Sequence, residues 1–161
     1  MCGEKLENSP DPGSAGVQVL PSSRHCFVCG AENERGLRKK FTAQGGRVHT
    51  EFAPEPWMVG YDNVIHGGLI STILDEVAVW AAYHAKGRYG VTVELTVRFR
   101  KPVLLGNVYR VEGWFVEDLG RRWVVDADIR DGEGNRLASA SVRIAPLSDE
   151  QSAEYRRKLA E

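Results

Sequence analysis

The sequence predicts an α+β protein in which one long central helix packs against a single antiparallel sheet of five or six strands. Three observations predict this fold class: a long stretch with helical apolar spacing, a strand pair before it, and four alternating runs after it. The chain has 161 residues, a length that suits one domain with a sizeable core. Because the helix and the sheet must bury each other's apolar faces, we expect the sheet to curve around the helix.

The central helix is predicted from Leu69 to Ala85. Its large apolar residues recur at three- and four-residue steps and form one wide face: Leu69, Ile70, Ile73, Leu74, Val77, Trp80 and Ala81. A second stripe surrounds an acid with small side chains: Ser71, Asp75, Ala78 and Ala82. Small side chains let another backbone approach closely, so we expect the helix to be buried on nearly all sides. Gly87 and Gly90 are expected to end it.

Strands are predicted on both sides of this helix. Before it, two short runs between Leu37 and Pro54 flank Gln44-Gly45-Gly46, a pattern typical of a hairpin. After it, short turns separate four alternating runs: Val91 to Phe99, Val108 to Val116, Arg122 to Arg130 and Leu137 to Ile144. This pattern indicates an antiparallel meander with one covered face. Alternation in the first run predicts that its apolar residues face one side of the sheet and Thr92 faces the other.

The two ends of the chain differ from this central part. Residues 1–23 are rich in Gly, Pro, Ser and Asn without an apolar period, which predicts a flexible N-terminal tail. Residues 24–147 are expected to form the folded domain. Residues 148–161 are expected to form a short polar helix or a tail.

Composition excludes several classes of partner. A net charge of -1 gives no global basic field for nucleic acid. No uncharged apolar run reaches the roughly 18 residues of a membrane span, and the N-terminus lacks the apolar region of a signal peptide. Three cysteines, an odd number, argue against a secreted disulfide framework. We therefore expect a cytoplasmic protein without nucleic-acid or membrane partners.

The motif His66-Gly67-Gly68, followed by Asp75 nine residues after the histidine, is the most informative feature of the chain. A helix start offers unpaired backbone N–H donors, and an acid inside the helix is a candidate base. These are two of the parts needed to hydrolyse an acyl bond. At about 1.5 Å per residue the acid lies roughly 10–14 Å along the axis from the glycines, too far for one small carbonyl to touch both. A second copy of the chain would bring them together.

Three segments carry a resemblance to a known family. They are His66-Gly67-Gly68-Leu69-Ile70-Ser71-Thr72-Ile73-Leu74-Asp75, then Thr92-Val93-Glu94-Leu95-Thr96-Val97-Arg98-Phe99-Arg100-Lys101-Pro102, and Cys26-Phe27-Val28-Cys29-Gly30 with Asn33 and Gly36-Leu37 following. In this order and spacing the sequence resembles the hotdog-fold acyl-CoA thioesterases, in particular the phenylacetate-pathway-type branch of the 4-hydroxybenzoyl-CoA thioesterase-like superfamily. The resemblance spans Cys26 to Ala145, so it implies a hotdog thioesterase domain over most of residues 24–147.

The resemblance also implies roles for individual residues. Asp75 matches the catalytic acid, which acts as a general base on water or, alternatively, as a nucleophile that forms a mixed anhydride. Thr92 matches the Ser or Thr that assists this acid or its water. The Gly67 N–H matches the donor that polarises the thioester carbonyl. Family members form this site across a dimer interface, so a homodimer is expected, with a tetramer of paired dimers left open.

Further residues are candidates for substrate binding. His66 is expected to orient the thioester or the neighbouring loop, and Gly68 adds a second N–H donor near the substrate. Three basic residues lie where they could hold the phosphates of coenzyme A, with a solvated strand end as the alternative interpretation: Arg98, Arg100 and Lys101. One departure concerns Gly60, because some relatives have an Asn there that helps to position the water. That role is therefore unassigned.

No metal or cofactor is expected from the sequence. His25, Cys26 and Cys29 suggest a metal knuckle, but a zinc site favours four ligands at compact spacing, and a packed metal-free loop is the preferred interpretation. Glu76 points about 100° away from its neighbour Asp75 on the helix and is interpreted as a structural or rim residue. A thioester is already activated, so its hydrolysis needs no redox cofactor.

Two other functions stay open. Asn63-Val64-Ile65-His66 partly matches the loop of hotdog-fold enoyl-CoA hydratases and dehydratases, although Asp62 is one place too close to the histidine and the proline of that loop is missing. The absent Asn at Gly60 leaves open a non-catalytic module that only binds acyl-CoA.

Overall fold

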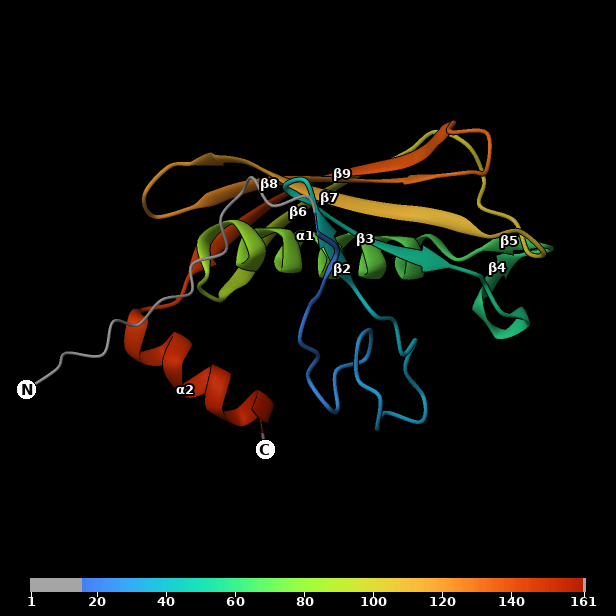
Figure 1. The fold of residues 1–161 in the computed structure, drawn as a ribbon. Helices are drawn as coiled ribbons and strands as arrows, with labels where there is room; N and C mark the ends of the chain where they lie inside the picture. Colours follow the sequence, from blue (N-terminus) through green and yellow to red (C-terminus); the bar gives the residue numbers. More distant parts are fainter. Residues whose placement is uncertain (1–15, 161) are drawn as a thin grey trace, which may run out of the picture.

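Helix α1 (Gly67–Lys86) lies along one face of a large antiparallel sheet (Figure 1). The computed structural model describes residues 16–160. The other elements, in chain order, are β1 (Gln18–Val19), β2 (Thr42–Gln44), β3 (Arg47–Phe52), the 3-10 helix η1 (Pro56–Met58), β4 (Val59–Tyr61), β5 (Val64–Ile65), β6 (Gly90–Phe99), β7 (Tyr109–Asp118), β8 (Trp123–Arg130), β9 (Arg136–Pro146) and α2 (Asp149–Ala160). The predicted α+β hotdog architecture is confirmed.

The main sheet has seven strands in the order β1-β2-β3-β7-β8-β9-β6, rather than the five or six expected. The additional strand is β1, in which Gln18 and Val19 pair with Ala43 and Thr42. The following Leu20 is buried. These residues belong to the segment expected to be a flexible tail, whose first fifteen residues lie outside the described part. A two-residue strand leaves no alternation in the sequence, so only its docking on β2 reveals it.

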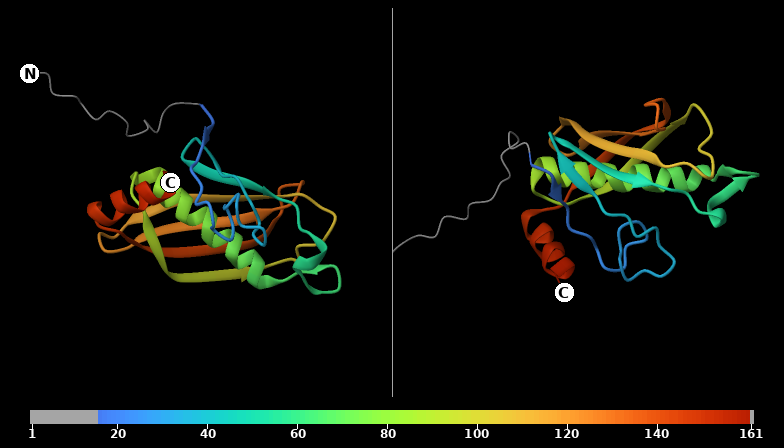
Figure 2. Two further views of the ribbon diagram at one scale, coloured as in Figure 1. Left: turned by 90° about the horizontal axis from the view of Figure 1, so that it is seen from below. Right: turned by 45° about the vertical axis from the view of Figure 1, so that its right-hand side comes forward.

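Strand β6 does not continue into a simple meander. Strands β7, β8 and β9 follow one another in the sheet, but β6 pairs with β9 and forms an edge (Figure 2, lower edge of the left view). The alternating pattern identified all four strands correctly. It carries no information about which strands pair. In the sheet, β8 and β9 lie between β7 and β6, so the connection from β6 to β7 passes both of them.

A β-bulge in β6 corrects the expected orientation of Thr92. The register shifts between Thr92 and Glu94, so that Thr92 lies opposite Ile144 while Leu95 lies opposite Val142. Both partners on β9 are fully buried against the helix. The extra residue of the bulge therefore puts Thr92 on the same, helix-facing side as Leu95, whereas strict alternation predicts the opposite side.

Helix α1 begins and ends as its sequence suggests. The His66 side chain caps the N-terminus, and Gly87, with a φ of 62°, adopts the left-handed conformation at the C-terminus. The buried residues of α1 include both the large apolar face and members of the small-residue stripe: Ile70, Ile73, Leu74, Val77, Ala78, Trp80, Ala81 and Ala82. Burial on nearly all sides, expected from the sequence, is thus found.

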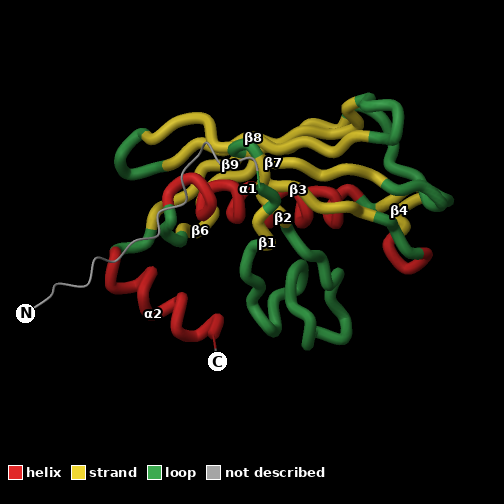
Figure 3. The backbone as a smooth tube through the Cα atoms, viewed as in Figure 1, coloured by secondary structure: helices red, strands yellow, loops and turns green. Residues whose placement is uncertain are grey.

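The face of α1 away from the sheet is partly covered by the segment of residues 20–40, which contains no helix or strand (Figure 3). Val28, Cys29 and Leu37 of this segment belong to the core.

Helix α2, in the segment expected to be a polar helix or a tail, lies beside the C-terminal end of α1. There, Arg156 donates a hydrogen bond of 3.0 Å to the Gly87 carbonyl. No helix among residues 16–160 is long and apolar enough to cross a membrane.

Close packing of α1 on β7 depends on Gly113. A methyl group at this position would lie 2.9 Å from the Val77 carbonyl oxygen, which belongs to the helix backbone and cannot rotate away. We expect Gly113→Ala to lower the free energy of unfolding by about 1–3 kcal/mol because the helix must shift. Urea denaturation followed by circular dichroism measures this. Gly132→Ala is the matched control, since nothing lies within 4 Å of a methyl group there; equal losses in both variants would contradict the explanation.

Candidate active site

Asp75 of α1 and Thr92 of β6 face each other beneath the sheet. The Thr92 hydroxyl donates a hydrogen bond of 2.7 Å to Asp75 Oδ1. The β6 bulge makes this contact possible, because it turns Thr92 towards the helix. Burial raises the pKa of Asp75 above its ordinary value, and the hydrogen bond from Thr92 offsets part of that rise. The carboxylate is thus held in one orientation and binds a proton more readily than an exposed aspartate.

The helix start offers one free backbone donor. His66 Nδ1 accepts a hydrogen bond of 2.9 Å from the Gly68 N–H. The donor expected at Gly68 is therefore already engaged within the chain. No acceptor among residues 16–160 engages the Gly67 N–H, which is the first of the unpaired donors of α1. Gly67 therefore presents the N–H group that a substrate oxygen could use.

A cavity of about 660 Å³ opens at this helix start. Its walls include His66 and Gly67, the apolar side chains of Ile70 and Phe99, and the basic residues Arg100 and Lys101. Arg98 lines a different hollow on the outer face of the sheet, together with Trp114 and Asp126, and Arg100 lines both this hollow and the cavity. Of the three basic residues grouped by the sequence, Arg100 and Lys101 thus border the cavity at the helix start and Arg98 does not.

Asp75 and Thr92 do not line this cavity. The residues expected to form one site therefore fall into two groups within a single chain, the acid with its threonine and the glycine with its cavity. Their separation agrees with the distance along α1 that the sequence implies.

Gly60 lies against the capping histidine. A methyl group at Gly60 would be 3.2 Å from the His66 Cα, so a larger side chain would have to displace His66. The neighbouring Asn63 occupies a left-handed turn with a φ of 62°, and its carbonyl accepts from the Leu105 N–H at 3.1 Å. The close approach to His66 explains why a glycine stands at position 60, and the left-handed turn explains why an asparagine stands at position 63.

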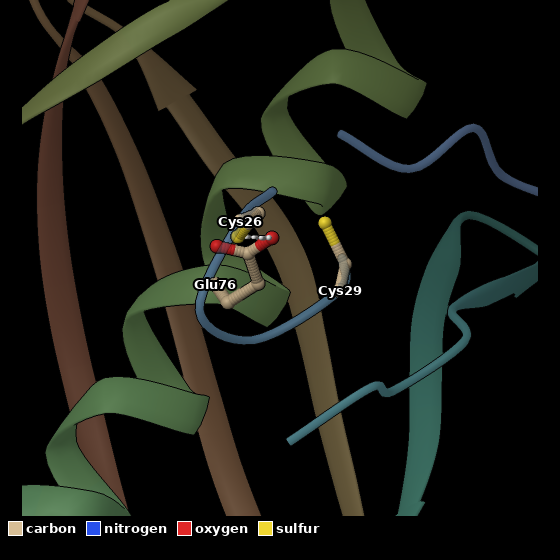
Figure 4. Close-up of side chains that lie close together, drawn as sticks. All are labelled: Cys26, Cys29 and Glu76. Atoms are coloured by element: carbon tan, nitrogen blue, oxygen red, sulfur yellow. Dashed lines mark hydrogen bonds between the residues drawn. The ribbon is translucent and has the colours of Figure 1, made fainter. Parts of the chain in front are cut away.

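A second polar cluster on another side of α1 joins Glu76, interpreted from the sequence as a structural or rim residue, to the two cysteines (Figure 4). Glu76 accepts hydrogen bonds from the Trp80 indole N–H at 3.0 Å and from the Cys26 thiol at 3.4 Å. Burial raises the pKa of Glu76 to about 7. Ligand atoms of Cys26, Cys29 and Glu76 lie within 4.8 Å of one another. The sequence held two signals for it, the close spacing of Cys26 and Cys29 and the four-residue spacing of Glu76 and Trp80 on the helix.

Comparison with known proteins relates the central part of the chain to one family. Residues 62–138 match the model of the Thioesterase superfamily, and this stretch includes Gly67, Asp75 and Thr92. The chain has the hotdog fold, and its central residues 62–138, a little under half of its length, match the thioesterase superfamily.

Two curated relatives are similar to part of this chain. An uncharacterized protein of Schizosaccharomyces pombe is 34% identical over 61 residues, which are 37% of this chain and 35% of that protein. The acyl-coenzyme A thioesterase THEM4 of Xenopus laevis is 29% identical over 86 residues, 53% of this chain and 38% of that protein. The chain thus spans little more than a third of the length of these relatives.

Solved structures of the superfamily share the fold. The thioesterase superfamily protein RHA08564 superposes with a TM-score of 0.71 and 25% identity over 76% of this chain and 60% of that protein. A hypothetical thioesterase of Streptococcus pneumoniae, solved with coenzyme A, has a TM-score of 0.60 and 24% identity over 63% of this chain and 82% of that one.

The environment of Asp75 predicts how stability depends on pH. The pKa of Asp75 is higher in the folded state than its ordinary value of 3.8. At a pH above 3.8 the folded protein must therefore either bind a proton at Asp75 or hold a poorly solvated negative charge. This contribution to stability falls as the pH rises through that window. We expect Asp75→Asn to melt a few degrees above the wild type at neutral pH, since the amide keeps a Thr92 partner without the buried charge.

Thermal melts from neutral pH down towards pH 3.8 measure this difference, which should shrink as the wild-type carboxyl becomes protonated. Asp62→Asn is the control, because Asp62 is exposed. A difference that stays constant over the whole range would show that Asp75 is not responsible.

Proposed function

We propose that this protein is an acyl-CoA thioesterase whose active site joins Asp75 of one subunit to the Gly67 N–H of its partner. The observation that carries the proposal is the hydrogen-bonded, half-buried Asp75–Thr92 pair within the segment that matches the superfamily. The similarity to an acyl-coenzyme A thioesterase supports the substrate class.

In this mechanism Asp75 acts as a general base. Its carboxylate takes a proton from a water molecule whose oxygen forms a bond to the thioester carbonyl carbon. The tetrahedral intermediate then collapses, the C–S bond breaks, and the proton passes to the coenzyme A sulfur. Burial raises the pKa of Asp75, and this makes its carboxylate a stronger base than an exposed aspartate. Direct attack by Asp75, giving a mixed anhydride, is the alternative first step.

The negative charge on the carbonyl oxygen requires a donor. The Gly67 N–H is unpaired and lies at the positive end of the α1 dipole, where it faces a cavity with apolar walls. Such a donor stabilises the transition state more than the substrate, because charge develops on the oxygen only as the bond forms. Phe99 lies against Gly67 and forms part of the wall that limits access of water.

A dimer is supported by the edge strand β6. Val91, Val93 and Phe99 are about half exposed on this strand, at 51%, 48% and 57%. An open edge of ten residues with exposed apolar side chains is a surface that a second copy can cover by strand pairing. Such pairing would run beside Thr92 and so bring the partner close to Asp75.

Coenzyme A is proposed to approach from the cavity at the helix start. Arg100 and Lys101 line its wall and suit the phosphate groups through charge-assisted contacts. The superposable thioesterase of Streptococcus pneumoniae was solved with coenzyme A, which supports this ligand class. Arg98, which lines only the outer hollow, is left out of the proposal.

The backbone donor can be tested by a pair of substitutions at Gly67. Gly67→Pro removes the N–H, yet proline is favoured at the first helical position and the extended His66 backbone, with a ψ of 128°, suits a following proline. Gly67→Ala keeps the N–H and brings a similar new contact with the Phe99 ring. We expect Gly67→Pro to lower kcat about 10²–10³-fold, and Gly67→Ala to lower it far less.

Free thiol release from a panel of short, long and aromatic acyl-CoA substrates measures this, with circular dichroism to verify folding. Equal activities of the two variants would exclude the Gly67 N–H from the mechanism. If the wild type adds water to crotonyl-CoA without releasing thiol, or binds acyl-CoA without either reaction, the thioesterase proposal is wrong.

Sharing of the site between subunits predicts complementation. Asp75→Asn and Gly67→Pro should each be nearly inactive alone. After unfolding and refolding together, half of the dimers would be mixed, and each mixed dimer would hold one intact site of two. We therefore expect about a quarter of the wild-type thiol release from an equal mixture. Refolded single variants serve as controls, and a mixture no more active than they are, or a fully active monomer in sedimentation, would contradict a shared site.

A further inference from the structure

We propose that Cys26, Cys29 and Glu76 form a binding site for one thiophilic divalent cation, best matched by Zn²⁺, which fastens the segment of residues 20–40 to α1 (Figure 4). The loop that carries both cysteines crosses α1 at Glu76. This site is separate from Asp75 and from the cavity at Gly67, so the proposal does not depend on thioesterase activity.

The spacing of the three side chains suits such a cation. Their ligand atoms all lie within 4.8 Å of one another. Tetrahedral zinc with sulfur ligands at about 2.3 Å separates those ligands by about 3.8 Å, so a small closure of the side chains would complete the geometry. Three protein ligands leave the fourth position to a water molecule, as in open zinc sites.

The loop already orients its sulfur atoms. The Val28 N–H points at Cys26 Sγ at 3.3 Å, and the Ser23 N–H points at Cys29 Sγ at 3.4 Å. Backbone donors aimed at sulfur stabilise the thiolate form that a metal requires. The turn is also too tight for a side chain after Cys29, because a methyl group at Gly30 would lie 2.4 Å from the Cys26 carbonyl oxygen.

The charges around the cluster favour a cation. Glu76 forms no ion pair with any lysine, arginine or histidine among residues 16–160, and it accepts hydrogen bonds from the Trp80 indole and the Cys26 thiol. A largely buried carboxylate beside two thiols is costly unless a positive charge compensates it. A divalent cation would displace the thiol protons and balance two thiolates and the carboxylate to a net charge of about -1.

The choice of metal follows from the ligands. Two thiolates select zinc and other soft ions over magnesium and calcium, which prefer oxygen ligands alone. The segment of residues 20–40 has no helix or strand of its own, so a metal bond to α1 would contribute the kind of cross-link that loop-rich regions commonly need.

Metal content and cobalt spectroscopy test the proposal with the full chain, purified under reducing conditions without chelators. We expect about one zinc per chain by mass spectrometry. Replacement by Co²⁺ should give a thiolate-to-cobalt charge-transfer band that Cys26→Ser and Cys29→Ser each abolish. Trp80→Phe removes the indole N–H that holds Glu76 while keeping a smaller aromatic ring at this buried position, and it should weaken cobalt affinity about 10–100-fold. Cys2→Ser and Glu34→Gln are the thiol and carboxylate controls and should keep the band.

A stability measurement covers the case in which a cysteine variant does not fold. Adding a zinc chelator should lower the melting temperature of the wild type, and equimolar zinc should restore it. Reduced wild-type protein that holds no stoichiometric zinc and gives no charge-transfer band on cobalt titration would overturn the proposal. A band unchanged in Cys26→Ser and Cys29→Ser would do so as well.

Discussion

The burial of α1 beneath the curved sheet determines where polar side chains can act in this protein. A helix that is apolar on one face and small on the next leaves few directions in which a charged group can point. Asp75 points towards β6 and meets Thr92, while its neighbour Glu76 points towards the loop that carries the two cysteines. Both carboxylates lose solvation, and both have a raised pKa in consequence. One helix thus holds two distinct polar sites about 100° apart around its axis, one directed to the sheet and the other to the loop.

Local patterns in the sequence predicted the elements and the fold class well. Helix α1, the hairpin around Gly45 and Gly46, and the strands β6 to β9 follow from apolar periods and turn residues, which depend on neighbours close in the chain. The position of β6 at the sheet edge could not be predicted, because strand pairing depends on contacts between distant segments. The bulge after Thr92 escaped detection for a similar reason, since one extra residue reverses the direction of a side chain without altering the composition.

Some residues of the candidate site could be predicted from the sequence and others could not. The family resemblance supplied Asp75, Thr92 and Gly67, and the structure joins the first two directly. It could not supply the different surroundings of the basic residues, since Arg98 lines only the outer hollow and Lys101 lines only the cavity at the helix start. The cluster of Cys26 and Glu76 joins residues 50 positions apart, so no motif spacing describes it. It exists only because an irregular loop docks on the helix.

The cap at the start of α1 has a consequence for the chemistry of His66. Since Nδ1 accepts the Gly68 N–H, the neutral ring must carry its hydrogen on Nε2. In this tautomer the imidazole has no lone pair left for abstracting a proton, and it presents a donor to its surroundings. His66 can therefore orient an acceptor atom of a substrate only for as long as it also keeps the helix start intact. Recruiting it as a base would require breaking the cap, which supports the proposal that Asp75 of the partner subunit abstracts the proton.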